Sequence, residues 1–153
     1  MRRLALATAN DDSPVAVVDP GWDRVLAYRP PAARAAVGAR LAAHEVTPDQ
    51  LRQVLSDGGD KLYAAAGSCA APGWADPLGG PLAVALLAYE VGVHAEHLAE
   101  RAGDVRSAAV NELLQEYSAV TVAEHLGVSR QAVREISNRG PLATLIERFW
   151  RPL

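Results

Sequence analysis

A stretch near the C-terminal end, residues 119–138 (AVTVAEHLGVSRQAVREISN), constrains the fold more than any other part of the chain. Thr121 followed by Glu124 has the spacing of a capping box, which predicts the start of a helix. Gly127 predicts the end of that helix, because a residue without Cβ readily adopts the left-handed conformation. Ser129 is a favourable N-cap for a second helix. The stretch therefore predicts two short helices joined by one tight turn.

Apolar residues in this stretch recur at helical spacing, which predicts a small core shared by the two helices. Ala123 is small where two helices that cross steeply must approach closely. The predicted core consists of Val122, Ala123, Leu126, Val128, Val133 and Ile136.

The opposite face of the second helix carries arginine, glutamine and asparagine, whose side chains can reach base edges and phosphates. The spacing of the small residue, the glycine and the apolar positions resembles the DNA-binding helix-turn-helix of bacterial transcriptional regulators, in which the second helix enters the major groove. The resemblance covers twenty of 153 residues. We expect base-edge contacts from Arg130, Gln131 and Arg134, and phosphate contacts from Thr121, Ser129, Asn138 and Arg139.

The net charge of the chain is −3, but the charge is unevenly distributed. Residues 117–153 contain five arginines and three glutamates, a balance of +2, so residues 1–116 carry −5. The positive excess coincides with the predicted helix pair, where phosphates would have to be neutralised. The acidic remainder would keep sequence-independent DNA binding weak.

Half of the residues are hydrophobic and 22% are charged, so the chain can bury a sizeable core. Its many alanines favour helix. We expect a mainly α, multi-helix fold in which residues 81–153 form a helical DNA-binding region with a C-terminal three-helix helix-turn-helix unit. Residues 1–80 would form an N-terminal helical region with a partner, effector or dimer role. The proline- and glycine-rich stretch 68–80 marks the boundary.

Turn and capping signals divide the N-terminal region. Two partly β-branched runs, 15–18 and 24–28, flank a stretch with the proline and glycine of a tight turn, which predicts a short β-hairpin or extended coil. Pro31 favours the start of a helix that runs to about residue 44. A second capping box at 47–50 predicts another helix, and residues 63–67 could form a further short one.

Two consecutive helices are expected immediately before the helix-turn-helix stretch. The first runs from Pro81 to about Ala102 and is apolar on nearly all sides at its start. The second runs from Asp104 to about Tyr117 and would supply the third helix of the DNA-binding unit. After that unit, residues 142–150 carry an apolar stripe, which predicts either a helix that closes the DNA-binding core or a dimerisation helix.

An enzymatic reading rests on Glu90, His94 and His97, which would share one face of a helix. Such side chains could hold zinc or iron if another segment supplied a further ligand, but the sequence has no second cluster of this kind. The single cysteine, Cys69, has no histidine near it and fits a reducing compartment. We therefore expect no enzymatic activity, no cofactor and no resident metal.

Together these features predict a cytoplasmic, sequence-specific double-stranded-DNA-binding protein, a transcriptional regulator of bacterial or phage origin that acts as a homodimer. The apolar patch 4–9 is too short for a secretory signal, and the apolar run 81–88 is too short to span a membrane. The alternative is a helical protein-interaction module. In that case residues 31–102 recruit a protein partner, and the helix-turn-helix stretch is structural or auxiliary.

Overall fold

The computed structural model describes residues 19–139, which form seven α-helices, one 3₁₀ helix and no β-strand. The mainly helical class is therefore the one that the sequence predicts. In chain order the helices are α1 (Pro20–Val25), α2 (Pro31–Ala42), α3 (Pro48–Ser56), α4 (Asp60–Ala66), the 3₁₀ helix η1 (Asp76–Leu78), α5 (Pro81–Glu116), α6 (Ala119–Leu126) and α7 (Arg130–Ser137).

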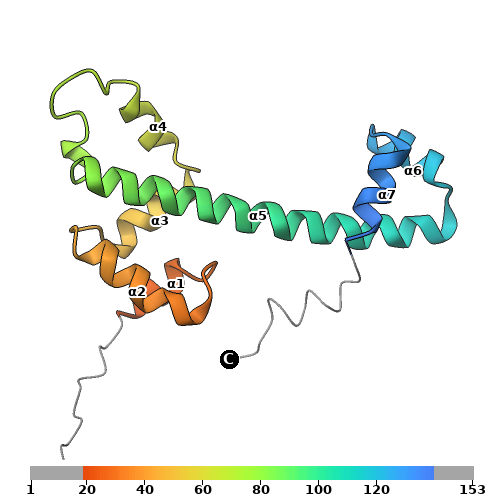
Figure 1. Cartoon of the computed structure of the whole chain (residues 1–153), viewed down its shortest axis with the longest axis horizontal. Helices are drawn as coiled ribbons and strands as arrows, with labels where there is room; N and C mark the ends of the chain where they lie inside the picture. The colour runs from red at the N-terminus through yellow and green to blue at the C-terminus, as the bar shows by residue number, and fades with distance from the viewer. Residues whose placement is uncertain (1–18, 140–153) are drawn as a thin grey trace, which may run out of the picture.

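Helix α5 organises the molecule, because every other group of helices lies near one of its ends (Figure 1). Its 36 residues correspond to a length of about 54 Å. Helices α1 and α2 lie on one side of its N-terminal half, and α4 with the following loop lies on the other (Figure 1). Helices α6 and α7 pack against its C-terminal end and against each other.

Two separate hydrophobic cores lie along α5. The first core belongs to its N-terminal half and contains Trp22, Val25, Leu26, Val37, Leu41, Val46, Leu51, Val54, Leu62, Ala75, Ala83, Val84 and Leu87. The second core belongs to its C-terminal end and contains Val110, Val122, Ala123, Val133 and Ile136. The two cores thus separate within α5, beyond Leu87 and before Val110, whereas the sequence placed a boundary at residue 80.

The prediction of two helices over residues 81–117 is wrong, because α5 runs through the expected break without interruption. No proline follows Pro81 in this helix, and a single glycine inside a helix costs only about 1 kcal/mol relative to alanine. Gly103 is buried inside α5, and the guanidinium of Arg139 occupies the space that a Cβ at this position would need. The glycine therefore provides room for a side chain from the end of α7 and does not end the helix.

Side-chain caps mark the start of two of the N-terminal helices, α1 and α3. The Thr47 hydroxyl accepts a hydrogen bond from the Gln50 N–H at 3.1 Å, which confirms Thr47 as the N-cap of α3. The Gln50 side chain donates instead to the Leu78 carbonyl at 3.0 Å, so the reciprocal bond of the predicted capping box is not formed. Gly59, with a φ of 83°, ends the turn between α3 and α4. Helix α4 begins at residue 60, three residues before the short helix that the sequence suggested.

The predicted β-hairpin is wrong for the half of it that the structure describes. The Asp19 carboxylate accepts a hydrogen bond from the Gly21 N–H at 2.8 Å, and Pro20 occupies the first turn of α1. Asp19 and Pro20 therefore start a helix where a hairpin turn was expected, and residues 24–28 end α1 and form the turn after it. Residues 15–18 and the predicted C-terminal helix 142–150 lie outside the described residues.

Helix α5 is the one helix within residues 19–139 that is long and apolar enough to cross a membrane, by length and composition only. A core helix passes the same test. Its buried positions Val84, Leu87 and Val110 pack against other helices of this chain. The composition of α5 therefore does not by itself indicate a membrane.

Candidate nucleic-acid interface

The N-cap of helix α6 lies three residues before the predicted capping residue. Tyr117 is extended and ends α5, and Ser118 is the N-cap of α6. The Ser118 hydroxyl accepts a hydrogen bond from the Thr121 N–H at 3.2 Å and shares a second hydrogen bond with the Thr121 hydroxyl at 2.9 Å. The predicted capping box of Thr121 and Glu124 is therefore wrong, because Ser118 already satisfies the amides at this end.

The turn between α6 and α7 has the predicted chemistry. Gly127 adopts the left-handed conformation with a φ of 67°, and the Val128 N–H donates to the Ala123 carbonyl at 3.1 Å. No other atom lies within 4 Å of the position that a Cβ at Gly127 would take, so backbone conformation alone favours glycine there. The Ser129 hydroxyl accepts from the Ala132 N–H at 3.0 Å, which confirms it as the N-cap of α7.

Four of the six predicted core residues of the α6–α7 pair are buried: Val122, Ala123, Val133 and Ile136. The prediction is wrong for Leu126 and Val128, whose exposed fractions are 43% and 39%. Leu126 contributes instead to an apolar groove of about 260 Å³ between α5 and α6, and Val128 lies in the turn. Leu113, Tyr117, Thr121, Val122 and His125 line the rest of this groove.

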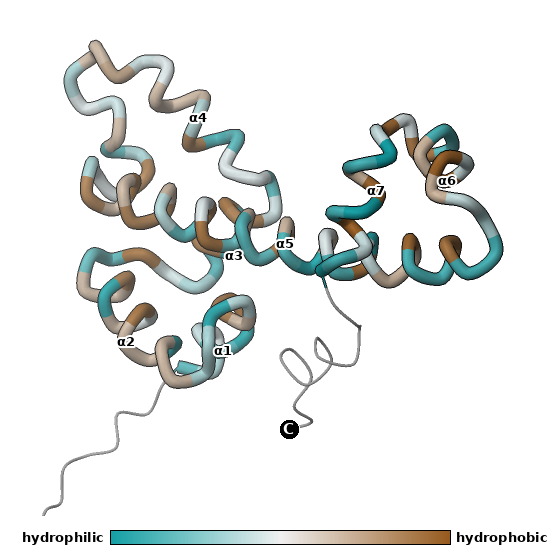
Figure 2. The backbone as a smooth tube through the Cα atoms, turned by 45° about the vertical axis from the view of Figure 1, so that its right-hand side comes forward, coloured by the Kyte–Doolittle hydropathy of each residue, from teal (hydrophilic) through white to brown (hydrophobic). Residues whose placement is uncertain are grey.

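Helix α7 is amphipathic: Val133 and Ile136 belong to the second core, and the polar residues of the helix are mostly exposed. Figure 2 shows hydrophilic and hydrophobic stretches alternating along α7. All the predicted contact residues of the second helix are exposed, namely Ser129, Arg130, Gln131, Arg134 and Asn138. The structure therefore brings them together on the outer side of α7 and at its N-terminal end. We call this surface the α7 outer face.

The side chains of the α7 outer face differ in whether they form hydrogen bonds within the chain. The guanidinium groups of Arg130 and Arg134 form no hydrogen bond or ion pair with any described residue, so both are available to a partner. The Gln131 amide donates to the Glu135 carboxylate at 3.2 Å. Glu135 is exposed and was not among the predicted contacts, although its position one turn after Gln131 is visible in the sequence.

Thr121 and Arg139 lie apart from the α7 outer face. Thr121 is half-buried on α6, and its hydroxyl is shared with Ser118. Arg139 lies over Gly103, with its guanidinium 3.9 Å from the Asp104 carboxylate. Both residues therefore already have partners within the chain.

Asn111 fixes the end of α7 to α5, a contact that the sequence analysis missed. Its side-chain amide donates to the Ser137 carbonyl at 3.2 Å, and it also lies 3.5 Å from the hydroxyl of the buried Ser107. These polar contacts bridge residues 26 positions apart in sequence, which local spacing cannot reveal. They hold α7 across the C-terminal part of α5.

The suggested metal ligand Glu90 is part of a buried ion-pair cluster. The Tyr28 hydroxyl donates to Glu90 Oε2 at 2.6 Å, and the Arg29 guanidinium donates to both carboxylate oxygens at 2.6 and 3.1 Å. His94 packs edge-on against the Tyr28 ring at a centroid distance of 4.9 Å. Within residues 19–139, no group of three or more histidine, cysteine, aspartate or glutamate side chains is arranged to hold a metal ion. Glu90 therefore ties the turn after α1 to α5.

Burial and hydrogen bonding shift the pKa values of Tyr28, Arg29 and His94 in this cluster. The pKa of Tyr28 is raised well above its ordinary value, chiefly by burial and then by the hydrogen bond to Glu90. The hydrogen bond to Glu90 also raises the pKa of Arg29. The pKa of His94 is lowered, first by burial and then by His97. The cluster therefore favours a neutral Tyr28, a charged Arg29 and a neutral His94.

The raised pKa of Tyr28 predicts a pH-dependent loss of stability. Below about pH 10 tyrosine is neutral in both the folded and the unfolded chain, so this stability is fully present there. As the pH rises above that value, Tyr28 ionises in the unfolded chain before it ionises in the folded chain, so the free energy of unfolding falls. In a titration of tyrosinate absorbance at 295 nm, Tyr28 should ionise only when the chain unfolds, which gives a late component in the titration. A Tyr28→Phe variant that keeps this late component would contradict the assignment.

No protein-family model, curated protein or solved structure gives a significant match to this chain. Its function therefore has to be inferred from the residues and their geometry.

Proposed function

We propose that α6, α7 and the C-terminal part of α5 form a helix-turn-helix that binds double-stranded DNA in a sequence-specific manner. In this proposal α7 is the recognition helix and enters the major groove. The chain acts in the cytoplasm as a transcriptional regulator of bacterial or phage origin.

One observation carries the proposal: α7 buries Val133 and Ile136 and exposes Arg130, Gln131 and Arg134 on its outer side. A helix about 10–12 Å across fits a major groove about 12 Å wide. Arginine can pair in bidentate fashion with guanine, and glutamine with adenine. The two arginines have no partner among residues 19–139, so binding would not first have to break an internal ion pair.

Gln131 and Glu135 would change partners on binding. Their mutual hydrogen bond lies on the α7 outer face, so Gln131 must release Glu135 to reach a base. The Glu135 carboxylate would then either accept from a cytosine amino group or repel the phosphates. Glu135 would therefore increase the discrimination between DNA sequences more than the overall affinity for DNA.

The contacts that set the register on DNA would come from hydroxyl and amide groups at the ends of the helices. Ser129 and Asn138 flank the α7 outer face and are exposed. Thr121 and Arg139 would assist only if their internal contacts with Ser118 and Asp104 open. Phosphate contacts of this kind position a protein without reading sequence.

The regulator would act as a homodimer, because two-fold symmetric readers bind paired half-sites about 34 Å apart or a multiple of that spacing. Each copy would contribute one α7. The predicted apolar stripe at 142–150 is one candidate for the dimer contact.

Replacing Arg134 with alanine should weaken binding to the preferred duplex by about 1–3 kcal/mol and relax the preference at one base pair. Fluorescence anisotropy on that duplex and its single-base variants measures both effects. Arg40→Ala is the matched control, because Arg40 is an exposed arginine on α2 and far from the α7 outer face. An unchanged sequence preference would remove Arg134 from the readout.

A second candidate is a protein-interaction module, favoured by exposed apolar side chains around the first core. Tyr63 on α4 and Leu82 and Tyr89 on α5 are largely exposed. In this case the Arg130→Ala, Arg134→Ala double variant would keep its protein partner. A Tyr63→Ser, Leu82→Ser, Tyr89→Ser triple variant would lose that partner, as measured by co-purification with the tagged chain.

A further inference from the structure

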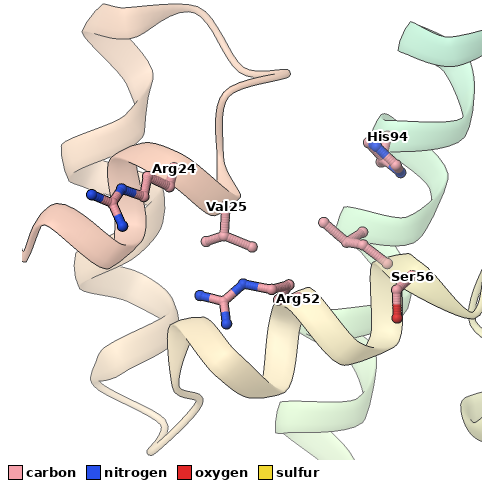
Figure 3. A pocket seen from close by; sticks show the side chains of 6 residues that line it. Arg24, Val25, Arg52, Ser56 and His94 are labelled. Atoms are coloured by element: carbon pink, nitrogen blue, oxygen red, sulfur yellow. The ribbon is translucent and has the colours of Figure 1, made fainter.

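An open cleft of about 580 Å³ lies between α1, α3 and α5, at the side of the first core (Figure 3). We call this open cleft the cavity. Its volume lies within the range of about 300–1,000 Å³ that is typical of small-molecule sites. The cavity is lined by Arg24, Val25, Arg52, Leu55, Ser56 and His94.

The lining has an apolar middle and a cationic end. Val25 is buried and Leu55 is half-buried, and together they form the apolar middle. Arg24 from α1 and Arg52 from α3 extend their guanidinium groups toward the same end, while His94 and Ser56 lie at the other (Figure 3). The arrangement therefore separates positive charge from apolar surface.

Two acidic side chains on the helices around the cavity have a basic partner. Glu90 is paired with Arg29, and Asp49 is paired with Arg52 on the surface of α3. The Arg24 guanidinium has no hydrogen bond or ion pair with any described residue. Arg24 therefore contributes an uncompensated positive charge, and Arg52 can turn from an exposed ion pair that is worth only about 0–1 kcal/mol.

His94 adds no charge to the opposite end near neutral pH, because burial lowers its pKa and His97 lowers it further. A neutral imidazole offers one donor and one acceptor nitrogen. Together with the Ser56 hydroxyl, it can bind a neutral polar group of a ligand. The positive charge of the cavity is thus confined to the arginine end.

We propose that this cavity binds a small aromatic anion. Its carboxylate or sulfonate is held by Arg24 and Arg52, and its ring lies on Val25 and Leu55. The planar guanidinium group matches such anions in bidentate geometry, and the apolar middle accepts a ring but no second charge. The site is separate from the α7 outer face and does not depend on DNA binding.

The test compares two dyes with the same ring system, the anionic 1-anilinonaphthalene-8-sulfonate and the uncharged N-phenyl-1-naphthylamine. The full chain should bind the sulfonate dye more tightly than the uncharged dye, with one dye per chain. The Arg24→Gln, Arg52→Gln variant should bind the sulfonate dye about tenfold or more weakly, because charged hydrogen bonds are lost, and should bind the uncharged dye unchanged. Both arginines are exposed, so this variant keeps the fold, which circular dichroism verifies.

Arg40→Gln, Arg101→Gln is the matched control, because it removes the same charge from exposed arginines outside the cavity. Leu55→Trp, which fills the apolar middle, should weaken both dyes. Equal loss of the sulfonate dye in the two double variants would overturn the proposal. Equal affinity of the full chain for both dyes, or no binding of the sulfonate dye, would overturn it as well.

Discussion

Replacing Arg29 with leucine should lower the free energy of unfolding by about 3 kcal/mol or more, because it leaves a buried carboxylate without its cation. Glu90 is only 4% exposed, and the Tyr28 hydroxyl would be its one remaining donor among the hydrogen bonds now seen. Urea denaturation followed by tryptophan fluorescence measures the effect, since Trp22 lies in the first core.

Two variants separate the loss of the ion pair from the loss of an arginine side chain. Arg40→Leu, at an exposed position on α2, should change the unfolding free energy by roughly 0.5 kcal/mol or less. The triple variant Tyr28→Phe, Arg29→Leu, Glu90→Leu should recover most of the loss, because an apolar replacement leaves no buried charge unpaired. If Arg29→Leu matches Arg40→Leu, the cluster contributes nothing to stability.

Replacing Val133 with aspartate should unfold α6 and α7 and abolish the proposed DNA binding while the first core stays folded. Val133 has no exposed surface and lies in a core of only five buried residues. An unpaired charge at this position should cost about 3–5 kcal/mol of stability, as the breaking of a buried ion pair does. The second core is too small to offset that loss. Circular dichroism should show a loss of helix, and the urea transition of Trp22 should be unchanged.

Val120→Asp is the matched control, since it makes the same substitution on α6 at a position that is 49% exposed. It should leave the helix content and the DNA affinity close to those of the parent chain. If Val133→Asp instead unfolds Trp22 in the same transition, the two cores form one cooperative unit.

The features that the sequence predicted correctly are those set by neighbouring residues. The capping of α3 by Thr47 and of α7 by Ser129 involves groups three residues apart. The turn at Gly127 depends on one backbone conformation. The exposure of Arg130, Gln131 and Arg134 was also predicted correctly, because the buried and exposed faces of α7 follow from helical periodicity.

The features that could not be predicted from the sequence depend on contacts between residues that lie far apart along the chain. Glu90 resembled a metal ligand because Tyr28 and Arg29 lie 62 and 61 residues away in sequence. Gly103 resembled a helix end because the side chain that it accommodates comes from Arg139. The cavity between α1, α3 and α5 likewise combines three separate segments.

Selection of bound sequences from a random duplex library, followed by a salt titration on the enriched sequence, tests the DNA-binding proposal most directly. The Arg130→Ala, Arg134→Ala variant is carried alongside. The expected result is a palindromic site with half-sites about 34 Å apart or a multiple of that spacing, which the variant fails to bind. Affinity for this site should fall steeply with salt. No enrichment, or weak binding that is indifferent to sequence and equal in the variant, would contradict the assignment of α7 as a recognition helix.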